Sequence, residues 1–480
     1  MPDETTGTDG AARAGGDRRT AGTAVSPVGA ARSPVRAAPC VSGHPAGHRR
    51  LVHRATGLRE LTEPQGGRVT TPQKRAGAGR TVLALLTALG SLAGASLAGA
   101  APADAAPSRV EVAPGVVYER FDLQAAAGPA RAHVLTVDLR HPRVRLDLLY
   151  PGVVAGRATV SRLADRQAAV AGVNGDFFNI TETQHPGVEA TGASVGPAVA
   201  GRRTLKAAVP DGQRFGPALP PGTSTRDVFG VGTDRRARLD SLVLVGSVTT
   251  PVERLPLGGL NQYALPVGSV GAFTADWGVA SRVRATCGTD TERAAPCSAD
   301  THEVTVRYGR VVATGQTPGG GPIAPGTTVL VGREAGAQWL RKLAVGDTVR
   351  VRHRLVAARS GVPYRFVVGG CPVLSGGQPL PGLDHRATAV RSAAGLADGG
   401  RRVLLLALDG SPAYRTGLTV AELAGVMRTL GAVDAFSLDG GGSSTLVARE
   451  PGTTAVTVRN HPSGGVERPV PNGIGVFSTG

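Results

Sequence analysis

One stretch, residues 403–447, constrains the fold more than any other part of the chain. It opens with a short apolar run, 403–408, which is typical of a buried strand, and a second such run follows at 435–438. Between them the sequence predicts a helix, because Thr419 and Glu422 form a capping box and apolar residues then recur at helical spacing. Strand, helix and strand at these lengths predict a βαβ unit with parallel strands and a right-handed crossover.

Each predicted strand of this unit ends in an Asp-Gly pair. The first runs into Asp409-Gly410, and the second runs into Asp439 and the glycine-rich turn 439–444, DGGGSS. Parallel strands end at one edge of a sheet, which is where ligands bind in open α/β sheets. The simpler interpretation is a pair of tight turns, but three successive glycines cost backbone entropy that a plain turn does not require.

The distribution of charge along the chain does not indicate a nucleic-acid partner. The 480 residues carry a formal net charge of +17, and nearly all basic residues are arginines. The excess is spread along the sequence without a basic block or interleaved aromatic residues, so we do not expect nucleic-acid binding.

Residues 69–105 have the features of an export signal. Lys74, Arg75 and Arg80 precede an apolar run, 81–97, and a small-residue cleavage site follows at 103–105. A membrane anchor is the alternative, but we favour cleavage, with no stable membrane anchor afterwards and a secreted protein. Residues 1–68 have the composition of a disordered or untranslated extension, with translation beginning further downstream.

Three cysteines follow the predicted signal. Cys287 and Cys297 bracket a short polar loop, and export permits disulfides, so we expect these two to be paired. Cys371 is then left over, either buried or free. The cysteine and histidine spacing does not indicate a metal site.

The rest of the chain is rich in predicted strands. Alternating patterns over 108–149 predict the start of a sheet, and a buried strand ends in Asn174-Gly175-Asp176. That turn suits either ligand contact or a hairpin. We therefore predict an α+β fold, namely a mixed sheet with a C-terminal βαβ unit and a β-rich inserted module.

The predicted domain organisation follows these patterns. A first part of the catalytic domain occupies residues 106–225, and a second part occupies residues 381–480. Short β-branched runs separated by glycine predict the β-rich insertion, residues 226–380.

Five motifs in order resemble the phosphodiester glycosidase family, the family of the lysosomal uncovering enzyme that removes N-acetylglucosamine from a sugar phosphodiester. They are NGDFF (174–178), RSAAG (391–395), LDG (408–410), LDGGGSSTL (438–446) and RPVPNGIGVF (468–477). The resemblance covers roughly residues 110–480. The family more often has threonine where Ser392 stands, which is a mild departure.

The resemblance implies hydrolysis at an anomeric carbon whose leaving group is a phosphate ester. Asp409 and Asp439 are the candidate nucleophile, base or acid, and Arg391 is the candidate for neutralising the leaving phosphate through its bidentate fork. The remaining candidates are substrate-binding residues on the glycine-bearing turns: Asn174, Gly175, Asp176, Gly440, Gly441, Gly442, Ser443, Thr445 and Asn472. Neighbouring strands would favour retention of configuration, and one intervening strand would favour inversion.

We therefore expect a secreted glycoside hydrolase that cleaves a sugar-1-phosphodiester, such as a cell-wall or exopolysaccharide component. Two alternatives stay open. One is a carbohydrate-binding or exopolysaccharide-assembly protein without turnover. The other is a phosphoesterase that uses a divalent cation, Ca²⁺ or Mg²⁺, held by the clustered Asp and Asn oxygens. The sequence leaves the need for a cofactor undecided.

Overall fold

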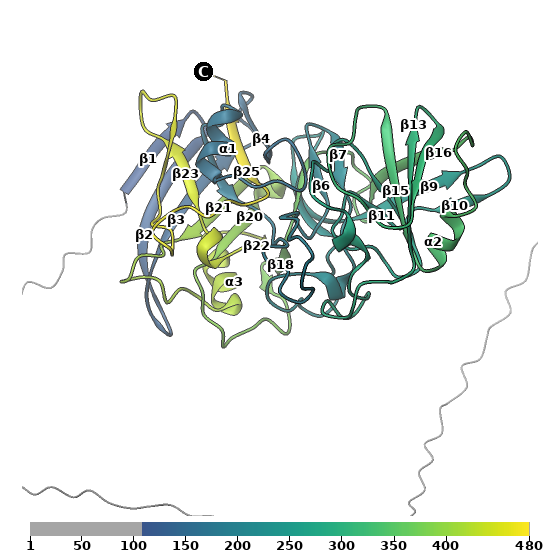
Figure 1. Cartoon of the computed structure of the whole chain (residues 1–480). Helices are drawn as coiled ribbons and strands as arrows, with labels where there is room; N and C mark the ends of the chain where they lie inside the picture. Colours follow the sequence, from purple (N-terminus) through teal and green to yellow (C-terminus); the bar gives the residue numbers. More distant parts are fainter. Residues whose placement is uncertain (1–107, 480) are drawn as a thin grey trace, which may run out of the picture. The chain divides into compact units, whose positions relative to one another are not determined.

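The computed structural model describes residues 108–479, and its largest sheet has eight strands (Figure 1). All neighbouring pairs in this sheet are antiparallel. In spatial order the strands are β1 (Ser108–Ala113), β2 (Val116–Ala125), β3 (Gly128–Asp138), β21 (Arg402–Leu408), β20 (Ser392–Ala397), β22 (Asp434–Leu438), β18 (Cys371–Ser375) and β19 (Gln378–Pro379).

A second, five-stranded sheet packs against one face of the first. Alternate residues of β3, β20, β21 and β22 join residues of the second sheet in one buried apolar cluster, as the two-residue period of a strand requires. The strands of the second sheet, in spatial order, are β24 (Val456–Val458), β23 (Leu446–Arg449), β5 (Ala171–Asn174), β25 (Gly473–Ser478) and β4 (Val144–Leu149).

Two helices cover the outer faces of this pair of sheets. Helix α3 (Val420–Thr429) packs its apolar stripe on the other side of the eight-stranded sheet, and the predicted Thr419–Glu422 capping box is present. Helix α1 (Val160–Arg166) packs on the five-stranded sheet. The result is a four-layer arrangement of helix, sheet, sheet and helix.

The predicted α+β class is confirmed, but the prediction of a mixed sheet is wrong for the eight-stranded sheet. Strands β21 and β22 do run in the same direction, with α3 between them in sequence. They are not neighbours, because β20 lies between them and pairs antiparallel with both. The small residues of β20, SAAGLA, are all buried, which lets this strand sit in the centre of the core.

The β-rich part of the chain forms two further sheets. One contains β10 (Arg254–Pro256), β9 (Ala237–Thr249), β8 (Asp227–Gly232), β17 (Tyr364–Gly369), β6 (Ala198–Ala200) and β7 (Arg203–Lys206), with β16 (Arg350–Ala357) paired to β9. The other contains β11 (Gly259–Leu260), β12 (Val270–Phe273), β15 (Thr327–Arg333), β13 (Thr301–Arg307) and β14 (Arg310–Gly315), and α2 (Ala335–Leu340) packs on β15 and β13.

The predicted domain boundaries stay a prediction, although the strand pairing bears on where they lie. Strands β6 and β7 precede residue 226 but pair within the β-rich sheet, while β18 precedes residue 381 but pairs with β22 in the eight-stranded sheet. The predicted extension 1–68 and signal segment 69–105 lie outside the described residues.

The expected disulfide between Cys287 and Cys297 is present, and Cys371 is a buried free thiol. Burial raises the pKa of the Cys371 thiol to about 11, which keeps it protonated at neutral pH. Within residues 108–479, none of the helices combines the length and the apolar character needed to cross a membrane.

Candidate functional site

The centre of the candidate site is the turn that follows β22, where Asp439 opens the DGGGSS sequence. The backbone N–H of Asp439 donates to the Gly175 carbonyl at 2.8 Å, and Asn174 Nδ2 donates to the Asp439 carbonyl at 2.7 Å. Gly440 N–H donates to Asp439 Oδ1 at 3.0 Å. The residue is half-buried. These contacts fix Asp439 at the shared edge of the two stacked sheets.

Asn174, at the end of β5, is completely buried and joins three segments of the chain. Besides its bond to the Asp439 carbonyl, its Oδ1 accepts hydrogen bonds from Ser392 Oγ at 2.7 Å and from Thr445 N–H at 3.2 Å. The side chain of Asn174, which was predicted to bind substrate, thus mainly holds the Asp439 turn in place.

Gly175 permits a close approach that no other residue would allow. A Cβ at this position would lie 2.3 Å from Asn472 Oδ1, which accepts the N–H of Asp176 at 2.9 Å. Gly175 N–H also donates to the Asn472 carbonyl at 3.0 Å. Asn472, which is buried, therefore positions the turn that carries Asp176.

Asp176 is a buried carboxyl with unused hydrogen-bonding capacity. Its Oδ2 accepts the Gly196 N–H at 2.6 Å, while its Oδ1 has no partner among the described residues. Buried Lys206 attracts this carboxyl through its charge, and its ammonium donates to the carbonyls of Val195 at 3.2 Å and Ala207 at 2.7 Å. Burial raises the pKa of Asp176 and lowers the pKa of Lys206.

The carboxyl of Asp439 has a perturbed pKa as well. Burial raises it to about 6, against the opposing effects of a hydrogen bond from Ser443, the Gly440 N–H and the charge of Arg468. A carboxyl that titrates near neutral pH is suited to exchanging protons during a reaction.

Asp409 lies on the same sheet edge in a different environment. Its Oδ2 contacts His133 Nε2 at 3.2 Å and accepts the His461 N–H at 3.1 Å, while its Oδ1 accepts the Ser411 N–H at 2.9 Å. Burial acts to raise the pKa of Asp409, but these hydrogen bonds outweigh it and hold the pKa well below its usual range. Asp409 therefore stays ionised, and only 6% of the residue is exposed.

His133 extends this network into the core, and the sequence analysis did not single it out. Its Nδ1 lies 2.8 Å from the hydroxyl of Tyr118, and burial lowers its pKa, so the ring is neutral at pH 7. The sequence did indicate that His133 is unusual. It alternates with Leu135 and Val137, so a polar side chain lies on the same inward-facing side of β3 as two apolar ones.

Asp409 and Asp439 follow strands that flank β20. Ser392 pairs with Ala407 on one side and with Leu438 on the other, so one strand separates the two aspartates. At about 4.8 Å between neighbouring strands, their backbones are roughly 10 Å apart. No hydrogen bond joins the two carboxyls in the described part of the chain.

Arg391 is brought to this edge, but its guanidinium points to the helix-covered side of the sheet. Its Nε donates to the Leu418 carbonyl at 2.9 Å, and its Nη2 donates to the Ala387 carbonyl at 2.7 Å. Burial lowers its pKa. Through these contacts, Arg391 holds the backbone around Ala387 and Leu418 in place beside the site.

Arg468 is the arginine that contacts the glycine turn, and the sequence analysis did not select it. Its Nη1 donates to Ser443 Oγ at 3.3 Å, and its charge acts on Asp439. It lies so close to Gly442 that a Cβ there would be 2.5 Å from Nη2. The signal was its position at the head of the RPVPNGIGVF motif.

The remaining predicted residues belong to the same turn. Gly441 adopts a left-handed conformation with φ of +58°, which favours glycine. Ser443 and Thr445 are fully buried, and Thr445 Oγ1 has no hydrogen-bond partner among the described residues. The half-buried Asp439 and Arg468 are therefore the charged groups of this turn that a ligand can reach.

The charges at this site do not favour a bound cation. The charge of Lys206 acts on Asp176 and the charge of Arg468 acts on Asp439, so a positive side chain already offsets each carboxyl. Elsewhere in residues 108–479, His185 lies close to Cys287 and Cys297, but those sulfurs are joined in the disulfide and are not thiolates for a metal.

Gly442→Ala is expected to lower activity about tenfold while changing the free energy of unfolding by less than about 1 kcal/mol. The new methyl group would displace the flexible end of Arg468 rather than backbone. Initial rates with a sugar-1-phosphodiester would measure the effect on activity, and urea unfolding would measure the effect on stability. Gly425→Ala, at a position on α3 with no atom within 4 Å of the added Cβ, is the matched control and should keep the parent rate. An unchanged rate in Gly442→Ala would contradict a functional role for the Arg468 position.

Comparison with known proteins supports the family resemblance. Residues 300–477 match the family model for phosphodiester glycosidase, a glycosidase family, and this range includes the RSAAG, LDG, LDGGGSSTL and RPVPNGIGVF motifs. NGDFF lies before the matched range. No curated protein matches the sequence significantly.

Two solved structures share the fold, and a third, the zebrafish domain given last, is only weakly similar. A hypothetical protein from Synechocystis is 20% identical with a TM-score of 0.59, over 78% of this chain and 64% of the other. A "Putative exported protein" from Burkholderia pseudomallei K96243 is 25% identical with a TM-score of 0.55, over 73% of this chain and 74% of the other. The catalytic domain of zebrafish N-acetylglucosamine-1-phosphodiester alpha-N-acetylglucosaminidase, auto-inhibited by its pro-peptide, is 14% identical with a TM-score of 0.38, over 76% of this chain and 85% of the other.

The chain thus spans less than two thirds of the length of the Synechocystis protein. The resemblance to the phosphodiester glycosidase family that the motifs predicted is confirmed over residues 300–477.

Proposed function

We propose that this protein is a secreted glycosidase that hydrolyses a sugar-1-phosphodiester at the anomeric carbon. The observation that carries the proposal is the arrangement of charges at the DGGGSS turn. There, burial raises the pKa of the half-buried carboxyl of Asp439 to about 6, and the charge of Arg468, which donates to Ser443 of the same turn, acts on that carboxyl. The match to a family of glycosidases supports the reaction type.

In the proposed reaction, a water oxygen attacks the anomeric carbon while the bond from that carbon to the phosphate oxygen breaks. The phosphate monoester departs as an anion and keeps the bonding electron pair, so it needs charge neutralisation more than protonation. Arg468 supplies that charge through its guanidinium fork. The proton released by the water goes to Asp439, which acts as general base.

Asp409, Arg391 and the buried polar residues have supporting roles in this proposal. Asp409 holds the loop at His461 and fixes His133, and Arg391 fastens the segments on the helix side. Asn174 and Asn472 set the position of the turns that carry Asp439 and Asp176.

Asp439 acts as general base on the attacking water, and Asp409 takes no part in bond making or breaking. We therefore propose a single displacement by water with inversion at the anomeric carbon. The anomer formed first, observed by NMR before mutarotation, reports on this directly.

The proposed substrate is a phosphodiester-linked sugar of a cell wall or exopolysaccharide outside the cell. The disulfide between Cys287 and Cys297 supports an oxidising compartment. The structural similarity to a protein described as exported is in agreement with this location.

Hydrolysis in ¹⁸O-labelled water tests the proposed bond cleavage. Attack at the anomeric carbon places the label in the sugar, and mass spectrometry of the two products locates it. Label in the phosphate would overturn the proposal and indicate a phosphoesterase instead. Tight binding of the phosphodiester with no product would indicate a carbohydrate-binding protein.

A further inference from the structure

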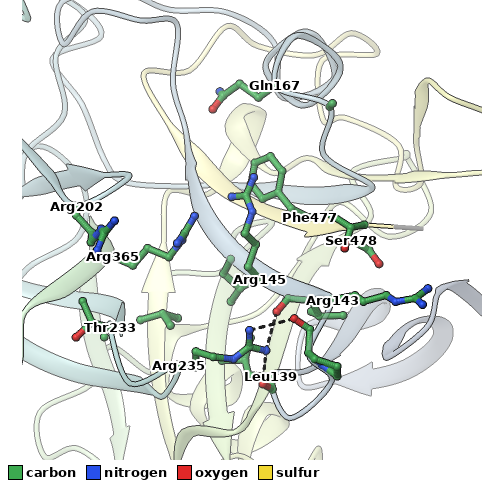
Figure 2. A pocket seen from close by; sticks show the side chains of 17 residues that line it. Leu139, Arg143, Arg145, Gln167, Arg202, Thr233, Arg235, Arg365, Phe477 and Ser478 are labelled. Atoms are coloured by element: carbon green, nitrogen blue, oxygen red, sulfur yellow. Dashed lines mark hydrogen bonds between the residues drawn. The ribbon is translucent and has the colours of Figure 1, made fainter. Parts of the chain in front are cut away.

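A charged cavity lies at the opposite end of the five-stranded sheet from Asp439. It has a volume of about 620 Å³ and is lined at the ends of β4 and β25 and by turns of the β-rich part (Figure 2). Its lining includes Arg143, Arg145, Arg202, Arg235 and Arg365. The candidate site lies just before the first residue of β25, and the cavity lies at the last residues of the same strand. The length of β25, about 17 Å, therefore separates the two sites.

The lining is strongly cationic. No acidic residue lines the cavity within the described residues. Arg235 forms part of the wall, because its Nη2 donates to the carbonyls of Leu139 and His141 at 2.9 and 2.8 Å. Arg143 and Arg202 are exposed, and neither side chain makes a hydrogen bond within residues 108–479. Their charges are therefore available to a ligand.

Arg145 and Arg365 lack a full complement of acceptors. Arg145 Nη1 and Arg365 Nε each lie 3.4 Å from Asp147 Oδ2 and so share one carboxylate oxygen. The other oxygen of Asp147 accepts the N–H groups of Leu148 at 2.9 Å and Gly201 at 3.0 Å. Arg365 Nε is buried and has no hydrogen bond among the described residues.

The two guanidiniums also oppose each other electrostatically. Burial lowers the pKa of Arg145, and the nearby charge of Arg365 lowers it further, with only Asp147 acting against them. Figure 2 shows Arg145, Arg202 and Arg365 extending into the same region from different elements. Among the described residues, Asp147 is the one carboxylate that contacts Arg145 and Arg365, so the group keeps a net positive charge, which a bound anion would offset.

We propose that this arginine-lined pocket binds a phosphate-bearing ligand of about the size of a sugar phosphate. A tetrahedral phosphate accepts hydrogen bonds from several directions, and guanidiniums on different walls suit it better than they suit a flat carboxylate. The volume lies in the range of pockets that hold small molecules. This site is separate from the proposed catalytic edge and does not depend on the proposed reaction.

The phosphate has two sources, a free sugar phosphate or a phosphodiester within a polymer. Titration calorimetry of the full chain at low salt with glucose 1-phosphate, and separately with poly(glycerol phosphate), distinguishes them. Binding of glucose 1-phosphate that the pocket variants weaken assigns the pocket to a small molecule, and binding of the polymer alone, weakened in the same way, assigns it to a chain segment. Binding of neither would overturn the proposal.

Variants locate the binding. Arg145→Gln/Arg365→Gln should weaken it at least about tenfold, and Arg143→Gln/Arg202→Gln, which alters only exposed side chains, should weaken it several-fold and still fold. Arg352→Gln/Arg354→Gln removes the same charge from exposed positions of β16 and should change it less than about twofold. Arg468→Gln removes the guanidinium of the candidate site and should leave this binding in place.

Two results would overturn the assignment. One is parent affinity in both pocket variants together with loss of binding in Arg468→Gln. The other is an equal loss in the pocket and β16 variants, which would show that the affinity comes from net charge alone.

Discussion

Asp439→Asn is expected to lower the rate of hydrolysis about a thousandfold or more. The same substitution should stabilise the folded protein at neutral pH. The amide cannot accept the proton of the attacking water, so general-base catalysis is lost. Because burial raises the pKa of Asp439 to about 6 in the folded chain, the ionised carboxylate is less favourable there than in the unfolded chain. Removing it should add on the order of 1 kcal/mol at pH 7, a value reduced for partial exposure.

The pH dependence gives the same prediction an independent check. Between the unfolded pKa of about 3.8 and the folded value of about 6, the folded chain binds more protons at this group, so its contribution to stability falls as pH rises. Activity changes in the opposite direction: the parent should lose about tenfold in kcat/KM per pH unit below about 6. Urea unfolding and pH–rate profiles measure these two trends.

A matched control is Asp300→Asn, at a surface aspartate that pairs with Arg341 in the β-rich part. It should leave both the activity and the free energy of unfolding at the parent values. If Asp439→Asn cleaves the substrate at the parent rate while folded, the general-base assignment is wrong. If it is inactive but also destabilised, the loss reflects structure rather than chemistry.

Asp409→Asn should instead destabilise the protein, by about 2–4 kcal/mol at pH 7. The ionised carboxylate accepts hydrogen bonds from Ser411 and His461 and contacts His133, and an amide cannot replace it as an acceptor on both sides. Its folded pKa is depressed, so its stabilisation is present above the unfolded pKa of about 3.8 and is lost on further acidification. The parent and the variant should therefore converge in stability in strong acid.

Denaturant unfolding at pH 7 and again below pH 3 would measure this difference. Asp122→Asn provides the comparison, because Asp122 forms an ion pair with Arg131 that is largely exposed, and it should cost less than about 1 kcal/mol. Two results would contradict the proposed role of the hydrogen bonds to Asp409. One is an equal loss of unfolding free energy in both variants. The other is a difference in unfolding free energy between the parent and Asp409→Asn that does not become smaller in acid.

The local features of this fold could be predicted from the sequence, whereas the strand order could not. Helix α3 begins where its capping box indicates, because Thr419 and Glu422 act on their own backbone. The disulfide follows from two cysteines on one short loop. The placement of β20 between β21 and β22 depends on its fit into the core, and nothing in its own sequence specifies the neighbours.

The candidate site divides in the same way. The turns that carry Asp409 and Asp439 were predicted from strand ends, but the side-chain partners of the site come from distant segments. Arg468 reaches the glycine turn, His133 reaches Asp409 from β3, and Lys206 stands near Asp176. Conversely, Arg391 of the RSAAG motif was selected to neutralise the leaving phosphate, and in the folded chain its guanidinium donates to backbone carbonyls instead.

The strand order also dictates when the protein can fold. Strand β3 pairs with β21, and β4 and β5 pair with β25, so both sheets of the core join segments that are far apart in the sequence. Closing such long loops is slow and entropically costly, while the β-rich part contains many pairings that are closer in sequence. The five-stranded sheet therefore cannot be completed on the ribosome before residues 473–478 have been made.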